Sequence, residues 1–191
     1  MYKVAVFVGS LRKDSINARF ARALGKLARG RLDFHLVDLS DLPVYNEDLW
    51  ENPPAGVLRM KDEIAAADAV LFVTPEYNRS IPPVIKNAID WGTRPWGQNS
   101  WAGKAAAIVG TSPGAVGTAA AQGHLRDIVT VVGTALMVQP EVYFVTKPGL
   151  IDDYLTVTDA DTKAFLEGWV AKFETWVRRL SAEGREETRA A

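Results

Sequence analysis

The chain has 191 residues, 22 basic and 23 acidic side chains, a formal net charge of −1 and no cysteine. This length suits one domain with one core. The near-zero charge excludes a whole-molecule field that would hold nucleic acid or an anionic membrane. The absence of cysteine excludes disulfides, thiolate metal sites and a cysteine nucleophile.

The first residues run directly into an apolar strand, without the basic leader and small-residue cleavage site of an export signal. We therefore expect a cytoplasmic protein with no membrane segment and no nucleic-acid partner. We expect a single domain over residues 1–180, followed by a polar tail over residues 181–191.

Short apolar runs alternate with helical segments along the chain. Because their apolarity is continuous, these runs predict strands that are covered on both faces. The predicted strands are Val4–Val8, Phe34–Val37, Ala69–Thr74, Ala105–Gly110 and Ala135–Val138. The predicted helices between them are Ile16–Ala28, Val57–Ala67, Pro82–Trp91 and Thr118–Val132. This alternation predicts a mostly parallel sheet with right-handed crossovers and helices on both faces.

The last predicted helix, residues 161–180, has the clearest periodicity. Its apolar side chains follow steps of three and four, which places them on one face. They are Leu166, Trp169, Val170, Phe173, Trp176, Val177 and Leu180. We interpret this stripe as core packing. The irregular region 39–55, with three prolines, is expected to wrap an edge of the sheet.

Ligands bind an open parallel sheet at the carboxyl ends of its strands, so the loops there indicate function. The loop 9–17 combines hydroxyl and amide side chains, one arginine and the free N–H groups of a helix start, which favours a monophosphate. Taken singly, Asp14 or Ser15 is better explained as a helix cap. The loop has neither G-x-G-x-x-G nor the P-loop pattern, which argues against a Rossmann pyrophosphate turn and a P-loop NTPase.

Two more loops follow the third and fourth predicted strands. Prolines stiffen residues 74–83, where Tyr77 and Asn78 offer an aromatic face and an amide suited to a flat heteroaromatic ring. Taken alone, this loop is equally compatible with a rigid turn. The glycines of residues 110–118 allow the backbone to approach a ligand closely, but they also suit a flexible connector.

Three motifs occur in order along the chain. They are Gly9-Ser10-Leu11-Arg12 with Ser15 and Asn17, then Pro75-Glu76-Tyr77-Asn78-Arg79-Ser80-Ile81-Pro82 continuing into Lys86-Asn87-Ala88-Ile89-Asp90-Trp91, and His124-Leu125-Arg126. Together they resemble the NAD(P)H-dependent FMN reductases of the flavodoxin-like superfamily, most closely the branch of bacterial quinone and chromate reductases. The resemblance covers nearly the whole chain. It implies a flavodoxin-like three-layer α/β sandwich with a five-stranded parallel sheet, and a noncovalently bound FMN.

The resemblance also implies roles for individual residues. The FMN phosphate would be held by Ser10, Arg12, Ser15, Ile16 and Asn17. The isoalloxazine would contact Pro75, Glu76, Tyr77 and Asn78, with Ser112 and Gly114 on its far side. No catalytic side chain and no metal is expected, because the flavin carries the chemistry. Glu76 is expected to act by position, mainly through backbone groups, and His35 and His124 are interpreted as structural.

The reaction implied is hydride transfer from NADPH or NADH to FMN, followed by electron transfer to a small-molecule acceptor in a ping-pong sequence. The acceptor classes are quinones, azo compounds, free flavin and oxidised metal anions. The family forms dimers and tetramers with flavin sites close to the subunit interface, so a homodimer or homotetramer is expected. The alternative is a flavodoxin-type electron carrier without its own NAD(P)H turnover. Such carriers are usually strongly acidic, and the net charge of −1 argues against this alternative.

Some positions depart from the family pattern. Asp14 stands where glycine is frequent, and a carboxylate there would repel a phosphate unless it turned away to cap the helix. Residues 118–121 lack the basic residue that often precedes the His-Leu-Arg motif. The segment that holds Trp91, Trp96 and Trp101 is compatible with an exposed aromatic patch beside the flavin and equally with buried packing residues.

Overall fold

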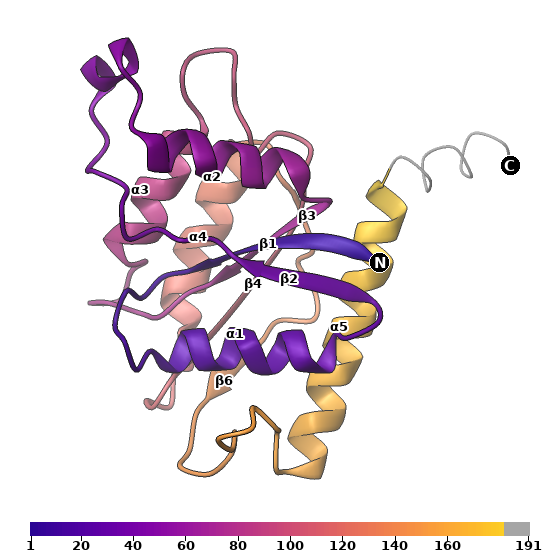
Figure 1. Ribbon diagram of the computed structural model, residues 1–191. Helices are drawn as coiled ribbons and strands as arrows, with labels where there is room; N and C mark the ends of the chain where they lie inside the picture. The colour runs from indigo at the N-terminus through magenta and orange to yellow at the C-terminus, as the bar shows by residue number, and fades with distance from the viewer. Residues whose placement is uncertain (182–191) are drawn as a thin grey trace, which may run out of the picture.

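The computed structural model describes residues 1–181, in which strands and helices alternate and build a parallel sheet with helices on both faces (Figure 1). The strands are β1 (Tyr2–Val8), β2 (Leu32–Leu36), β3 (Ala69–Val73), β4 (Ala105–Ser112), β5 (Ala135–Leu136) and β6 (Tyr143–Val145). The helices are α1 (Ile16–Leu27), α2 (Ala55–Ala66), α3 (Pro83–Gly92), α4 (Ala119–Val131) and α5 (Ala160–Leu180). A short 3-10 helix, η1 (Glu47–Glu51), interrupts the irregular region before α2. The predicted polar tail beyond residue 181 lies outside the described residues.

The strand order is β2-β1-β3-β4-β5, and all the pairs are parallel. This order confirms the flavodoxin-like prediction. β1 pairs with β2 on one side and with β3 on the other, since Val4 is in register with both Phe34 and Ala69. The strand order therefore reverses at β1, and the ligand-binding position of such folds is the crevice between the loops that follow β1 and β3.

The fifth position in the sheet differs from the prediction. The predicted strand at residues 135–138 is confirmed at its start, but its predicted end is wrong: β5 ends at Leu136, and β6 then pairs with the last residues of β4. Pro140 lies between β5 and β6. Proline has no N–H to donate, so a continuous ladder cannot pass through it. Six strands thus fill five positions.

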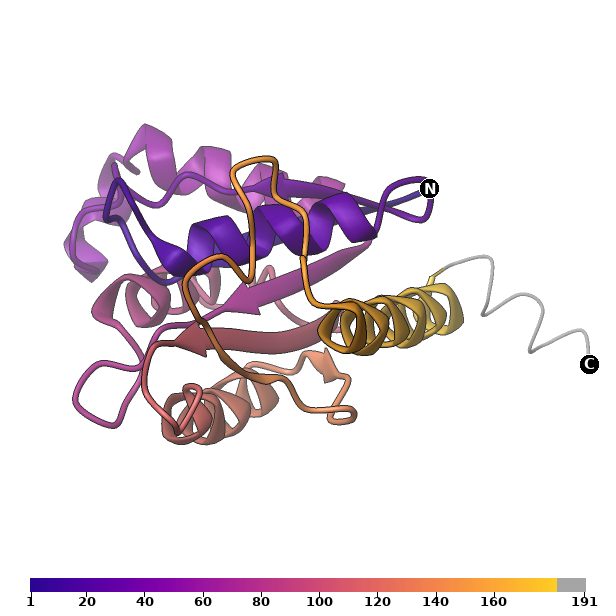
Figure 2. The same cartoon turned by 90° about the horizontal axis from the view of Figure 1, so that it is seen from below.

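The helices pack two separate cores against the sheet. α1 and α5 cover one face, while α2, α3 and α4 cover the other (Figures 1 and 2). The apolar stripe of α5 lies in the first core, which confirms its interpretation as packing. Its buried members are Leu166, Trp169, Val170, Phe173 and Val177. No helix within residues 1–181 combines the length and apolarity needed to span a membrane.

The tryptophans of the segment after α3 do not form one exposed patch. Trp91 and Trp101 are fully buried, whereas Trp96 is 88% exposed. Trp101 packs on Phe7 with ring centroids 5.1 Å apart, and Gly92 allows this packing because a side chain there would collide with the Trp101 ring. The segment leads into the start of β4, so it lies at the amino edge of the sheet. Trp96 is therefore at the opposite edge from the loops that follow β1, β3 and β4.

Candidate cofactor site

Three loops meet at the carboxyl edge of the sheet: residues 9–15 after β1, 74–82 after β3 and 113–118 after β4. Their close approach depends on glycine. A Cβ at Gly9 would lie 2.6 Å from Pro82 and 2.7 Å from Pro75. A Cβ at Gly110 would collide with the carbonyl oxygen of Thr74. The loops can converge because these positions carry no side chain.

The loop after β1 has the features of an anion site. Ser15 caps α1, since its Oγ accepts a hydrogen bond from the N–H of Ala18 at 3.1 Å. The N–H groups of residues 16 and 17 have no acceptor within residues 1–181. Over the same range, the side chains of Ser10 and Arg12 form no hydrogen bond or ion pair. A helix N-terminus with free donors, beside an unpaired arginine, fits a phosphate.

Asp14 does not compete for this position as a cap. Its side chain is exposed, and the cap of α1 is Ser15. The carboxylate is thus free to point into solvent, so its charge leaves the N–H groups of the helix start available.

Asn17 has a different role from the other residues of the loop. Its side chain is almost fully buried, at 2% exposure. Its Nδ2 donates to the carbonyl oxygen of Thr111 at 2.9 Å, and its Oδ1 accepts from the N–H of Thr111 at 3.0 Å. The amide therefore ties the start of α1 to the end of β4. The buried Oγ1 of Thr111 has no hydrogen-bond partner among the described residues.

The loop after β3 contains a tight turn of unusual backbone geometry. The N–H of Tyr77 donates to the carbonyl of Ser80 at 3.0 Å, and the N–H of Ser80 donates back to Tyr77 at 3.0 Å. Between them, Asn78 and Arg79 both have positive φ, at 51° and 67°. These features define a type I′ turn, which usually has glycine at its second central position. The turn presents the Tyr77 ring, 47% exposed, and the Asn78 amide at the surface.

Glu76 holds this turn against α4. Its Oε2 accepts hydrogen bonds from the N–H groups of Ala120 and Ala121 at 3.0 and 3.2 Å, while its Oε1 lies 3.2 Å from Arg79. α4 has no side-chain cap of its own, because Thr118 at its start adopts φ 72° and makes no capping bond. Glu76 therefore supplies a negative charge and two acceptors to the N-terminus of α4. These contacts use its carboxylate, and the expected positional role of Glu76 beside the flavin stays a prediction.

A second contact joins the turn to α4. The Oγ of Ser80 and the Nδ1 of His124 are 3.0 Å apart. His124 is thus an exposed side chain that links α4 to the loop after β3.

His35 lies on the edge strand β2, with its Nε2 3.5 Å from Glu63. Within the described part of the chain, no group of three acidic or histidine side chains could hold a metal ion.

The loop after β4 completes the site. The hydroxyl of Ser112 donates to the carbonyl of Gly114 at 3.1 Å, which shapes the start of the loop. Gly117 has φ 56°, and a Cβ there would lie 2.7 Å from the carbonyl group of Tyr143. β6 therefore sets the position of this loop through a close backbone approach.

The structure brings together the loops that carry the predicted site residues. Ser10, Arg12, Ser15 and Ile16 lie on the loop after β1 and the start of α1, Tyr77 and Asn78 on the turn after β3, and Ser112 and Gly114 beside them after β4. Sequence reasoning missed the link between Ser80 and His124 and the bonds from Glu76 to α4. The only sequence signal for the contact between Ser80 and His124 is that both residues lie in the motifs that resemble the family.

Comparisons with known proteins agree with this arrangement. A sequence profile of the family described as NADPH-dependent FMN reductase matches residues 2–149. A 2-hydroxy-1,4-benzoquinone reductase from Burkholderia sp. is 47% identical over 176 residues, which cover 92% of this chain and 96% of that protein. A quinone reductase from Pseudomonas putida is 47% identical over 179 residues, covering 93% of this chain and 96% of that protein.

A solved structure shows the same similarity in three dimensions. The flavoenzyme NAD(P)H:acceptor oxidoreductase FerB from Paracoccus denitrificans superposes with a TM-score of 0.92 at 53% identity, covering 94% of this chain and 98% of that one. The profile match spans most of the chain, and both relatives and structure align over nearly their full lengths. The chain belongs to the NADPH-dependent FMN reductase family.

Proposed function

We propose that this protein binds FMN at the carboxyl edge of its sheet and is an NAD(P)H-dependent reductase that passes electrons to quinones. One observation carries the proposal: a phosphate-type loop with unengaged donors lies beside a rigid turn that exposes Tyr77 and Asn78. The relatives named quinone reductase, at 47% identity, support the acceptor class. We propose that azo compounds, free flavin and oxidised metal anions are further acceptors.

The phosphate would be held by the loop after β1. Arg12 supplies a charge that no carboxylate in the described residues neutralises, and Ser10 supplies a hydroxyl. The N–H groups of Ile16 and Asn17 add donors at the positive end of α1. Asn17 acts as a positioning residue, because its side chain is fully engaged with Thr111. It fixes the distance between the phosphate donors and the loop after β4.

The flavin ring would lie between the loops after β3 and β4, with Pro75, Glu76, Tyr77 and Asn78 on one side and Ser112 and Gly114 on the other. When bound, FMN supplies the chemistry that accepts a hydride and passes electrons on. The protein residues would hold the ring and leave one face accessible. Glu76 keeps the turn fixed through its bonds to α4, so that Asn78 and the adjacent backbone can meet the ring edge in one orientation.

We also propose a homodimer or homotetramer in the cytoplasm. Support for the assembly comes from the exposed apolar side chains near the cofactor loops, Leu11 and Val44, at 59% and 85% exposure. The absence of cysteine is compatible with this location, because the protein is indifferent to a reducing environment.

The test is a spectroscopic titration. We expect the purified protein to retain FMN after excess flavin is removed and to show a flavin visible spectrum. Anaerobic NADPH or NADH should bleach that spectrum rapidly, and a quinone should restore it. Steady-state rates should then give parallel double-reciprocal lines, because donor and acceptor use the site in turn.

The electron-carrier alternative gives a different result. A carrier would keep its flavin oxidised under excess NADPH and NADH, yet dithionite would reduce it promptly. That outcome would contradict the reductase proposal and leave the flavin site standing. A protein that stays colourless after incubation with FMN would contradict both.

A further inference from the structure

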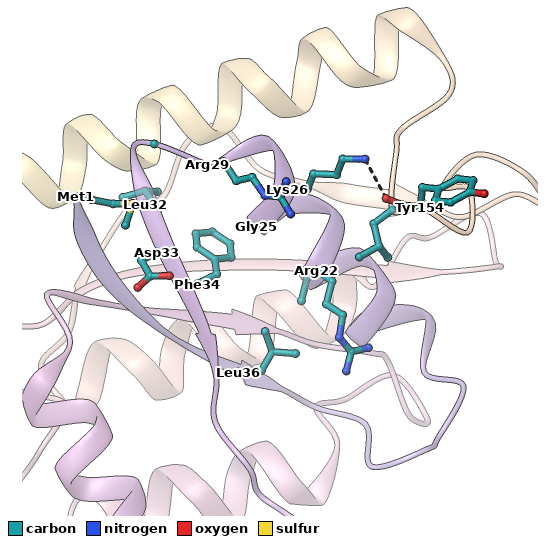
Figure 3. A pocket seen from close by; sticks show the side chains of 13 residues that line it. Met1, Arg22, Gly25, Lys26, Arg29, Leu32, Asp33, Phe34, Leu36 and Tyr154 are labelled. Carbon is teal, nitrogen blue, oxygen red and sulfur yellow. Dashed lines mark hydrogen bonds between the residues drawn. The ribbon is translucent and has the colours of Figure 1, made fainter.

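A second hollow lies away from the cofactor loops, between α1 and the edge strand β2 (Figure 3). It has a volume of about 700 Å³. Its lining comes from α1, β2 and the loop before α5, and it shares no residue with the cofactor loops. Figure 3 shows Met1 and Leu32 at one end, Phe34 between the strand and the helix, and Tyr154 at the other end. We call this hollow the α1–β2 groove.

The floor of the groove is apolar. β2 is the outermost strand, and Leu32, Phe34 and Leu36 line the groove from it. Gly25 allows α1 to approach this floor, since a Cβ there would lie 3.3 Å from Phe34. Phe34 and Leu36 are only half buried, so apolar surface stays in contact with water.

The rim of the groove is cationic. Arg22 and Lys26 lie one turn apart on α1, and Arg29 follows just after the helix ends. The guanidinium groups of Arg22 and Arg29 form no hydrogen bond or ion pair within residues 1–181. The carboxylate among the lining residues is Asp33. The rim thus carries an excess of positive charge in a chain whose net charge is −1.

The groove is closed at one end by a fixed segment. Lys26 Nζ donates to the carbonyl of Tyr154 and to the hydroxyl of Thr156, both at 2.9 Å. These bonds hold the loop before α5 across the helix, as the dashed line in Figure 3 marks for Tyr154. A closed end suits a small molecule better than a long polymer or an added strand, which would have to leave the groove at both ends.

From these features we infer that the α1–β2 groove binds an amphipathic anion, a molecule with an apolar body and a single carboxylate or phosphate end. The apolar body would cover Phe34 and Leu36, and the anionic end would meet Arg22 or Arg29. Burial of the apolar body and charge-assisted hydrogen bonds at its end supply the binding free energy. This site is independent of the proposed reductase function.

The test measures binding of dodecanoate, below its micelle-forming concentration, to the FMN-loaded protein by calorimetry. We expect saturable binding that weakens with added salt and leaves the visible spectrum of FMN unchanged. Dodecanol has the same apolar body without the charge and should bind about tenfold more weakly. A change in the FMN spectrum would place the ligand in the cofactor site and overturn the inference.

Two double variants locate the site. Arg22→Gln with Arg29→Gln should lower the dodecanoate affinity about tenfold, because both rim charges are lost. Arg178→Gln with Arg179→Gln removes the same charge from exposed positions on α5 and should leave the affinity unchanged. All four arginines are surface residues, so both proteins should unfold at the wild-type temperature. No saturable binding, equal binding of dodecanol, or equal losses in both variants would overturn the inference.

Discussion

The side-chain amide of Asn17 forms a pair of hydrogen bonds with the backbone of Thr111, 94 positions further along the chain. One bond joins Nδ2 to the carbonyl oxygen at 2.9 Å and the other joins the backbone N–H to Oδ1 at 3.0 Å. They connect α1, which follows the loop after β1, with β4, which leads into the opposite loop. The two halves of the candidate site therefore share one buried anchor.

Replacing this anchor should cost stability. Asn17→Ala leaves the N–H and the carbonyl of Thr111 buried without partners, so we expect the free energy of unfolding to fall by about 2 to 4 kcal/mol. Urea denaturation measures the loss. Asn99→Ala is the matched control, because Asn99 also makes two backbone hydrogen bonds but is exposed, and water can replace them. Similar losses in the two variants would show that burial of the Asn17 bonds is unimportant.

Arg12 should discriminate between FMN and riboflavin. Because its guanidinium is exposed and unpaired beside the helix start, Arg12→Ala should weaken FMN binding by about 1.5 to 3 kcal/mol. Riboflavin has no phosphate and should bind nearly as well as before. Lys13→Ala, at the neighbouring exposed position, is the control and should change FMN affinity less. Fluorescence titration gives both affinities, and equal losses for the two ligands would remove Arg12 from the phosphate site.

The elements of this fold could be predicted because each carries a local pattern. Continuous apolar runs marked β1, β3 and β4, and the three-four spacing of Leu166, Trp169 and Phe173 marked α5. β6 has only three residues and follows Pro140 closely, so no periodicity could develop within it. It is stable because it pairs with β4, which is a long-range property.

The site could be predicted as a set of loops but not as a set of contacts. The resemblance assigns Asn17 to the phosphate, whereas its side chain is engaged with Thr111. The carboxylate of Glu76 reaches Ala120, 44 positions away, and no spacing rule connects such residues. Burial of Trp101 likewise depends on how α3 packs on the sheet. Contacts of this kind follow from the tertiary fold, and local sequence patterns do not report them.

Asp159 should make the stability of α5 depend on pH. The hydroxyl and the backbone N–H of Thr162 hold the pKa of Asp159 below its usual value of 3.8. A carboxyl group whose pKa is lower in the folded state stabilises that state above the unfolded pKa, and this contribution is lost as pH falls through the folded pKa. Asp159→Asn should therefore lower the urea midpoint at neutral pH and have less effect in strong acid. Asp161→Asn, on the first turn of the same helix, is the control, and an identical pH profile for both variants would contradict the assignment.

Glu76 should stabilise both α4 and the turn that precedes α3. Glu76→Ala removes the cap of α4, and we expect a loss of about 1 to 2 kcal/mol in the free energy of unfolding. Glu76→Gln keeps one acceptor and loses the charge, so its loss should be smaller. Hydrogen exchange at the amides of Ala120 and Ala121 reports the cap directly and should accelerate most in the alanine variant. Unchanged protection of these two amides would exclude the capping role.

The backbone of Arg79 offers the most specific test of the turn. Its φ of 67° lies in the left-handed region, which glycine adopts readily and other residues adopt at a cost. Its ion pair with Glu76 is exposed and contributes little. Arg79→Gly and Arg79→Ala both lose that pair, but only glycine relieves the strained conformation. We expect the glycine variant to be more stable than the alanine variant by about 1 kcal/mol in urea denaturation. If alanine is equally stable, the turn between Tyr77 and Ser80 does not hold residue 79 in the left-handed region in solution.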